Sequence, residues 1–247
     1  MSKVLIVSGH PRLGDDSVAN KTILEELASL LPEAMIDHLD ELYPDYAFDV
    51  EAEQAKLAAA DVIVLQYPLW WYGWPSLLQK WVEDVFVRGF SHGSTGTALR
   101  GKKLVVSLTT GAAESYYDAQ PGGIEHFLAA VKATSALTGL EYAGVLPLYG
   151  VSYANRTDEA ARTDMIKRSR EHAKHLAEFN HSPAARQDAK QAPTSFIDEA
   201  GAGSITDLKL GGRHGCCRER TCQIVTFIEQ NHSVYAPRAL LGTRAIR

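Results

Sequence analysis

Five short apolar runs alternate with helical patterns along residues 1–180, and this alternation constrains the fold more than any other feature. The runs cover residues 3–8, 34–39, 61–67, 104–108 and 142–149. Helical patterns are present at 18–31, 49–60, 75–86, 124–137 and 158–179. Runs of this kind are typical of strands buried on both faces, so we expect a parallel sheet with right-handed crossovers and helices on both faces.

The number and spacing of the strands predict a doubly wound sheet with the strand order 2-1-3-4-5. Its ligand crevice is expected between strands one and three, at the carboxyl ends of the strands. We expect one domain over residues 1–180. Residues 181–247 begin with a polar linker and continue into a glycine-rich stretch, so they are expected to form a C-terminal extension that is largely disordered.

Composition excludes several classes of protein. Hydrophobic residues make up 45% of the chain and charged residues 22%, as in ordinary globular proteins. The net charge of −5 gives no cationic footprint, which argues against a nucleic-acid partner. No apolar run approaches the roughly 20 residues of a membrane helix, and the first strand leaves no room for a signal peptide. We therefore expect a cytoplasmic protein.

The cysteines argue against a metal centre. All three, Cys216, Cys217 and Cys222, lie in the extension, and the adjacent pair fits no common zinc-ligand spacing. We expect no metal.

The loop after the first strand has the features of an anion site. Ser17, Val18, Ala19 and Asn20 stand at a helix start, where backbone N–H groups and the helix dipole attract a phosphate, and His10 can add a hydrogen bond. The segment is neither a GxGxxG nor a Walker A loop. Ordinary helix capping by Asp16 or Ser17 is the alternative interpretation.

The loop after the third strand is aromatic. All four tryptophans of the chain lie between residues 70 and 81, and Pro68, Leu69, Trp70, Trp71 and Tyr72 directly follow or end the strand. Large flat side chains at the carboxyl edge of such a sheet predict a planar ligand. Trp81 lies at the helical spacing of core residues, and we expect it in the core.

The loop after the fourth strand is a turn of small residues, Thr109, Thr110, Gly111 and Ala112. Hydroxyls and backbone N–H groups in such a turn can approach the edge of a flat heterocycle. A phosphate anchor, an aromatic wall and a polar turn together describe a site for flavin mononucleotide.

These residues resemble a known family, the NAD(P)H:quinone oxidoreductases of flavodoxin-like fold, relatives of DT-diaphorase. The chain looks most like the bacterial branch that includes the ancillary subunits of glutathione-gated potassium efflux systems. The resemblance extends over residues 3–180. It is carried by Gly9–Pro11, Ser17–Asn20, Leu42–Asp45, Glu53–Gln54, Gln66–Tyr72, Pro75–Phe86, Arg88–Phe90, Ala98–Lys102 and Thr109–Gly111.

The resemblance implies that His10 and Ser17–Asn20 bind the phosphate and ribityl chain of FMN, with FAD as the alternative cofactor. It places Leu69–Tyr72 and Thr109–Ala112 around the isoalloxazine ring, and it makes Tyr117 an active-site tyrosine that holds or protonates the quinone. It also implies a ping-pong, two-electron reduction of quinones by NADH or NADPH, and a homodimer.

The chain departs from the family pattern in its small-residue turn and in its histidines. Ala112 replaces a common glycine, and no histidine closely follows Tyr117. His126 is the nearest, and we expect it to pack on the next helix, so a histidine proton relay is not expected.

Two other functions are weighed against the reductase. The first is a regulatory subunit on a membrane potassium-efflux transporter, peripheral at the inner face of the membrane and with secondary quinone reductase activity. The second is a one-electron flavodoxin carrier, which the chain fits poorly because its surface is not strongly acidic.

Overall fold

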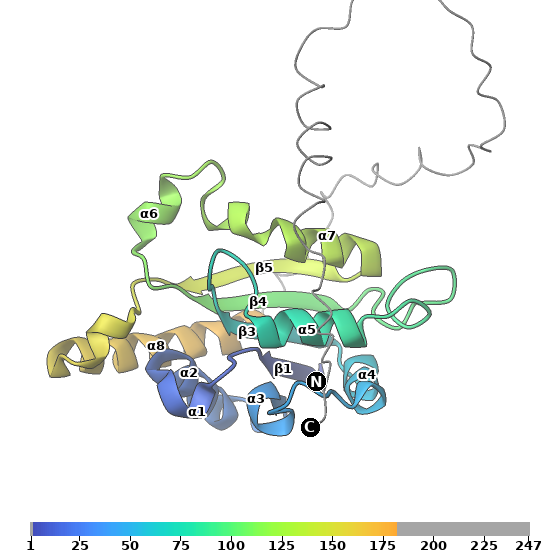
Figure 1. The fold of residues 1–247 in the computed structure, drawn as a ribbon, viewed down its shortest axis with the longest axis horizontal. Coiled ribbons are helices and arrows are strands. Elements are labelled where there is room, and N and C mark those ends of the chain that lie inside the picture. Colours follow the sequence, from blue (N-terminus) through green and yellow to red (C-terminus); the bar gives the residue numbers. More distant parts are fainter. Residues whose placement is uncertain (1, 182–247) are drawn as a thin grey trace, which may run out of the picture. The chain divides into compact units, whose positions relative to one another are not determined.

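The computed structural model describes residues 2–181, and these residues contain one parallel sheet of five strands (Figure 1). The strand order is β2-β1-β3-β4-β5, as expected. All four neighbouring pairs are parallel, so the carboxyl ends of the strands share one edge. The strands are β1 (Val4–Ser8), β2 (Met35–His38), β3 (Val62–Pro68), β4 (Lys103–Thr109) and β5 (Glu141–Leu148).

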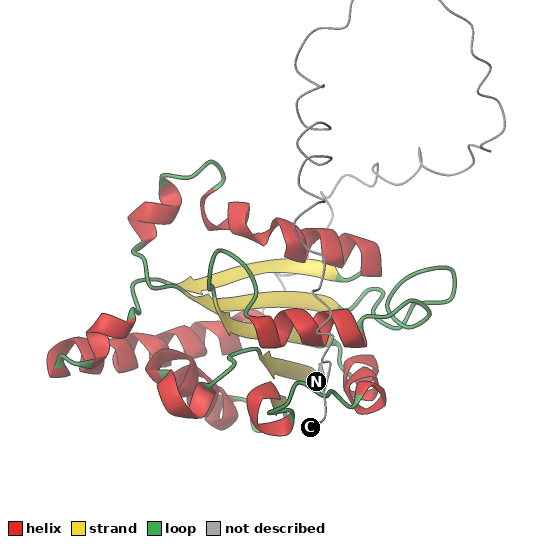
Figure 2. Ribbon diagram, viewed as in Figure 1, coloured by secondary structure: helices red, strands yellow, loops and turns green. Residues whose placement is uncertain are grey.

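Helices cover both faces of this sheet (Figure 2). The longer ones are α2 (Val18–Leu30), α4 (Val50–Ala59), α5 (Ser76–Val85), α7 (Ala129–Thr138) and α8 (Glu159–His181). The short ones are α1 (Leu13–Asp16), α3 (Leu39–Leu42), α6 (Glu114–Asp118) and the 3-10 helices η1 (Gly123–Leu128) and η2 (Tyr153–Arg156).

Alternate residues of the central strands enter two separate cores. Ile63 and Leu65 of β3 pack with side chains of α4, α5 and α7. Val64, between them, packs with side chains of α2 and α8. Successive side chains of a strand point to opposite faces, so a strand buried on both sides needs apolar residues at nearly every position. This explains the uninterrupted runs that predicted the sheet.

The expected helices are present, and they differ from the prediction in their bounds and, in one case, in their continuity. The pattern at 124–137 is divided between η1 and α7, and α5 begins at Ser76 with Pro75 as its N-cap residue rather than its first helical residue. The short helices α1, α3 and α6 were not anticipated, because each is too brief to show a helical period.

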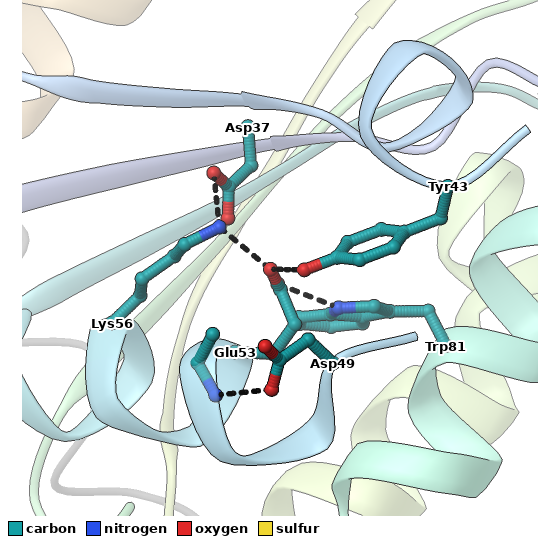
Figure 3. Close-up of polar contacts among 7 residues, drawn as sticks. Asp37, Tyr43, Asp49, Glu53, Lys56 and Trp81 are labelled. Carbon is teal, nitrogen blue, oxygen red and sulfur yellow. Dashed lines mark hydrogen bonds and ion pairs between the residues drawn. The ribbon is translucent and has the colours of Figure 1, made fainter. Parts of the chain in front are cut away.

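A buried polar network fixes α4 against β2, α5 and the chain after α3 (Figure 3). The carboxylate of Glu53 is completely buried and accepts hydrogen bonds from Tyr43 (2.8 Å), Trp81 (2.9 Å) and Lys56 (2.6 Å). Lys56 also pairs with Asp37 at 2.8 Å. Burial and the bond to Glu53 raise the pKa of Tyr43 to about 12. Trp81 is buried in the core, as predicted, and its indole N–H has a polar partner there in Glu53.

The proposed extension at 181–247, with its three cysteines, lies outside the described residues, apart from its first position in α8. Across residues 2–181, no helix is both long enough and apolar enough to cross a membrane.

Candidate functional site

A cavity of about 220 Å³ opens at the carboxyl edge of the sheet, where the loops after β1, β3, β4 and β5 meet. Its wall includes the start of α2, the indole of Trp70, the turn at 109–111 with its two hydroxyls, and the guanidinium of Arg156. The lining residues are His10, Ser17, Val18, Ala19, Asn20, Pro68, Trp70, Thr109, Thr110, Gly111, Val151, Ser152, Tyr153, Arg156 and Met165.

The start of α2 forms one end of the cavity. Ser17 is the N-cap residue, and its hydroxyl accepts from the backbone N–H of Asn20 at 3.2 Å. The first N–H groups of a helix have no partner within the helix, and the dipole makes this end partly positive. The capping interpretation is therefore confirmed for Ser17, and a capped helix start still offers the N–H groups of Val18 and Ala19 to an anion.

Asn20 connects this helix start to two strands. Its amide nitrogen donates to Ser17 Oγ at 3.1 Å and to Thr109 Oγ1 at 3.0 Å. Its amide oxygen accepts from Gln66 Nε2 at 2.8 Å. Asn20, Gln66 and Thr109 are all buried. Buried hydrogen bonds of this kind fix α2 relative to β3 and β4, so the floor of the cavity is preorganised.

His10 and Trp70 also line the cavity. The imidazole lies edge-on to the indole, with ring centroids 5.3 Å apart and an interplanar angle of 69°. His10 Nδ1 accepts from the backbone N–H of Arg12 at 3.1 Å. The neutral ring then carries its hydrogen on Nε2, so His10 is a hydrogen-bond donor beside the helix start.

The aromatic loop is a tight turn in which two bulky residues have positive φ. Gly73 N donates to Trp70 O at 3.1 Å, and Trp71 and Tyr72 between them have φ of 49° and 64°. Two central residues with φ above zero make a type I′ turn, which normally holds glycine or asparagine. The turn exposes 96% of Trp71, whereas Trp70 is 39% exposed and lines the cavity.

The turn after β4 is tied to the loop after β5. Thr110 N donates to Leu148 O at 2.9 Å, and Val151 N donates to Thr110 O at 2.8 Å. The Thr110 hydroxyl and the N–H of Gly150 both donate to the carbonyl of Ala112, each at 2.9 Å. These bonds explain why the β5 loop shares the cavity wall with Thr109–Gly111.

Tyr117 lies within an aromatic cluster and does not line the cavity. It is only 4% exposed, and its ring contacts Tyr116, Phe127 and Tyr149 at centroid separations of 5.2, 5.5 and 5.5 Å. Burial raises the pKa of Tyr117, and the Thr110 side chain opposes that rise in part. His126 packs edge-on against Phe127 at 5.2 Å.

Most of the predicted site residues come together in the cavity, but some lie elsewhere. Leu69 is buried in the core, Ala112 packs partly buried against the same core, and Tyr72 contacts Tyr116 and Phe127. These residues and Trp71 and Tyr117 are not among the lining side chains.

Sequence reasoning missed the contribution of the β5 loop, namely Val151, Ser152, Tyr153 and Arg156, and that of Met165. The guanidinium of Arg156 lies 3.5 Å from the ring centroid of Tyr153. The missed signal is topological: β5 borders β4, so its loop must lie beside the Thr109–Gly111 turn. Within residues 2–181, no group of three or more His, Cys, Asp or Glu side chains is placed to hold a metal ion.

Comparison with known proteins identifies relatives over most of the described chain. The family model described as a flavodoxin-like fold matches residues 2–173. General stress protein 14 of Bacillus subtilis is 39% identical over 186 residues, which are 73% of this chain and 98% of that protein. The glutathione-regulated potassium-efflux system ancillary protein KefF of Klebsiella pneumoniae is 45% identical over 115 residues, 47% of this chain and 64% of that protein.

Solved structures agree with this. The crystal structure of general stress protein 14 from Treponema denticola in complex with FMN has a TM-score of 0.63 at 26% identity, covering 72% of this chain and 99% of that one. An NADPH-quinone reductase from P. pentosaceus shares the fold, with a TM-score of 0.55 at 24% identity over 70% of this chain and 98% of that one. The chain therefore belongs to the flavodoxin-like fold family, and the relatives it is similar to include general stress protein 14 and KefF.

Proposed function

We propose that the protein is an FMN-dependent NAD(P)H:quinone oxidoreductase that reduces quinones to hydroquinones by two electrons. The observation that carries the proposal is the cavity in which a helix start, an indole and a hydroxyl-bearing turn meet. FMN has the same three parts in the same order: a phosphate, a flat tricyclic ring and a polar pyrimidine edge. A relative of 26% identity, from Treponema denticola, binds FMN.

The phosphate end of FMN suits the start of α2. Ser17, Val18, Ala19 and Asn20 would bind the phosphate and ribityl chain through backbone N–H groups and the Ser17 hydroxyl. The Nε2–H of His10 would add a donor. The α2 residue Ala19 is small and buried, so an anion can approach the backbone closely.

The ring of FMN suits the opposite part of the cavity. Pro68 and Trp70 would contact its apolar surface, while Thr109, Thr110 and Gly111 would hydrogen-bond the pyrimidine edge. Leu69 and Ala112 would support these loops from the core. Trp71 and Tyr72 extend the turn outward, where they would border the substrate. Bound flavin would supply hydride transfer between a nicotinamide and a quinone.

Tyr117 would act from its aromatic cluster rather than from the wall of the cavity. Because the phenol is buried and does not line the cavity, we propose that it supports the turn after β4 that would meet the pyrimidine edge. We further propose that NADH or NADPH is the donor and that the chain forms a homodimer, on the basis of the family resemblance.

The proposal is tested by identifying what the purified full-length chain binds. The protein is expected to show flavin absorbance, and heat extraction followed by chromatography should release FMN rather than FAD. If the protein is colourless, the stripped chain should be titrated with FMN. A chain that neither carries nor takes up FMN contradicts the proposal.

A second candidate function follows from the 45% identity to the KefF ancillary protein. In this role the chain would dock on a membrane potassium-efflux transporter, with quinone reduction secondary. Affinity purification of the tagged chain from detergent-solubilised membranes should then recover such a transporter, and recovery of none contradicts this function.

A further inference from the structure

The hydroxyl groups of Tyr72 and Tyr116 form a hydrogen bond of 2.9 Å. Tyr72 belongs to the turn after β3, and Tyr116 belongs to α6, in the long connection after β4 (Figure 1). The rings are nearly parallel, with centroids 6.5 Å apart and an interplanar angle of 24°. The pair therefore bridges the two loops that flank the carboxyl ends of β3 and β4.

Both side chains are held in place from the core side. Tyr72 stacks on Phe127 at 5.2 Å and 25°, and Tyr116 lies edge-on against the buried Tyr117 at 5.2 Å and 88°. Tyr72 also has a φ of 64°, in the left-handed region that a bulky side chain adopts only under strain. Backbone strain of this kind persists only where surrounding contacts enforce it, and it is concentrated at functional sites.

Both phenols nonetheless remain open to solvent. Tyr72 is 51% exposed and Tyr116 is 42% exposed, in contrast with the 4% of Tyr117. When one phenol donates to the other, the accepting phenol keeps its own O–H for a third partner. That O–H is polarised by the bond it accepts, which makes it a better donor. The pair thus presents one directed donor at the edge of the site.

The protonation state suits a donor. The hydrogen bond with Tyr72 is the main reason why the pKa of Tyr116 is raised above its usual value of 10.0, and a phenol keeps its hydrogen at neutral pH. Trp70, at the start of the same turn, lines the cavity, as does Gly111, which precedes α6. The two loops that carry the hydroxyls therefore both contribute to the wall of the cavity.

We propose that the Tyr72–Tyr116 hydroxyl pair binds the carbonyl oxygen of the quinone and donates the proton that completes its reduction. The inference rests on the proposed function and names two catalytic residues for it. Reduction of a quinone adds one hydride and one proton, while the nicotinamide donor loses the hydride and leaves as the oxidised cofactor. The pair supplies the proton to the quinone oxygen, and solvent restores it through the exposed phenols.

The test compares two electron acceptors in the flavin-loaded, full-length protein. Benzoquinone needs a proton when it is reduced, whereas ferricyanide takes one electron and no proton. Tyr72→Phe, Tyr116→Phe and the double variant keep the rings and their stacking but remove the hydroxyls. Tyr46→Phe is the matched control, because its hydroxyl contacts Ser76 on the surface, 3.1 Å away.

We expect kcat/KM for benzoquinone to fall about 10-fold in each single variant and about 100-fold in the double variant, since general acids contribute about 10²–10⁴-fold. Ferricyanide turnover and flavin content should stay within about twofold of the wild type, a range that corresponds to less than 1 kcal/mol. Tyr46→Phe should match the wild type with both acceptors.

Two results would overturn the inference while leaving the proposed function intact. One is benzoquinone turnover that is unchanged in the double variant. The other is an equal loss with both acceptors, which would assign the pair a purely structural role. If the wild-type chain oxidises no nicotinamide with either acceptor, the proposed function itself fails, and the inference fails with it.

Discussion

The side-chain nitrogen of Asn20 donates to the hydroxyl of Thr109 at 3.0 Å, across 89 residues of sequence. This bond joins the two parts of the site that the proposed cofactor would touch at its opposite ends, the start of α2 and the turn after β4. Since Asn20 also contacts Ser17 and Gln66, one buried side chain sets the relative position of three elements.

Replacing Asn20 should therefore weaken flavin binding. Asn20→Ala leaves the buried groups of Gln66 and Thr109 without partners, at a cost of about 1–3 kcal/mol. We expect the FMN dissociation constant, measured by titrating the stripped protein, to rise about 10-fold. Ser29→Ala, on the exposed face of the same helix, should leave the constant unchanged. Equal FMN dissociation constants for Asn20→Ala and the wild type would show that Asn20 has no such role in flavin binding.

The two adjacent tryptophans should differ in their effect on flavin binding. Trp70 lines the cavity beside His10, whereas 96% of Trp71 is exposed. Trp70→Ala removes an aromatic contact worth about 1–3 kcal/mol with a stacked ring, so it should raise the FMN dissociation constant about 10-fold or more. Trp71→Ala should raise it less. A larger rise in the FMN dissociation constant for Trp71→Ala than for Trp70→Ala, measured by the same titration, would mean that the turn changes its conformation when FMN binds.

The buried carboxylate of Glu53 should be important for stability. Glu53→Gln removes the negative charge beside Lys56 and leaves buried donors poorly matched, and breaking a buried pair costs about 3–5 kcal/mol. Urea unfolding of the full-length variant should show this loss. Glu83→Gln is the control, because Glu83 is exposed and accepts a hydrogen bond from the neighbouring Gln79, so its effect should stay within about 0.5 kcal/mol. Similar midpoints for the two variants would contradict the account of the network.

Acid should destabilise the protein through His172. This imidazole is buried and lies 2.7 Å from the hydroxyl of Ser107 on β4, and burial, together with the nearby His175, lowers its pKa from 6.5 to about 4. Since the folded-state pKa is the lower one, the stabilising contribution is complete above pH 6.5 and is lost as pH falls toward 4. The shift corresponds to about 3 kcal/mol.

Urea unfolding at a series of pH values measures this contribution. The wild type should lose stability between pH 6.5 and 4 more steeply than His172→Gln, which cannot titrate there. Parallel curves for the two proteins would show that His172 is not the responsible group.

The sheet could be predicted because its determinants are local. Each strand is a continuous apolar run, and residues such as Ile63 and Val64 are both apolar because they enter opposite cores. Parallel pairing then places the loops after β1, β3 and β4 at one edge without further information. Ser17, Asn20, Trp70 and Thr109 were found in this way, because topology alone brings their loops together.

The direction of single side chains could not be predicted. Trp70 and Trp71 differ only because a turn with positive φ directs one inward and the other outward, and no pattern of residue types indicates such a turn. Tyr116 and Tyr117 are adjacent in the short helix α6, yet Tyr116 is exposed and Tyr117 is buried, because successive residues of a helix point in different directions. The burial of Glu53 could not be predicted either, because an acidic, alanine-rich helix resembles a surface helix. Its partners Tyr43, Trp81 and Lys56 also come from different parts of the sequence.

The most direct test of the central claim is the stoichiometry of a single reaction. The FMN-loaded, full-length protein should be mixed anaerobically with NADH or NADPH and a benzoquinone, and the oxidised nicotinamide and hydroquinone should be quantified together. The account predicts that the two products form in equal amounts without a semiquinone signal by electron paramagnetic resonance. A flavin-loaded protein that oxidises neither nicotinamide, or that releases semiquinone as its main product, would contradict it.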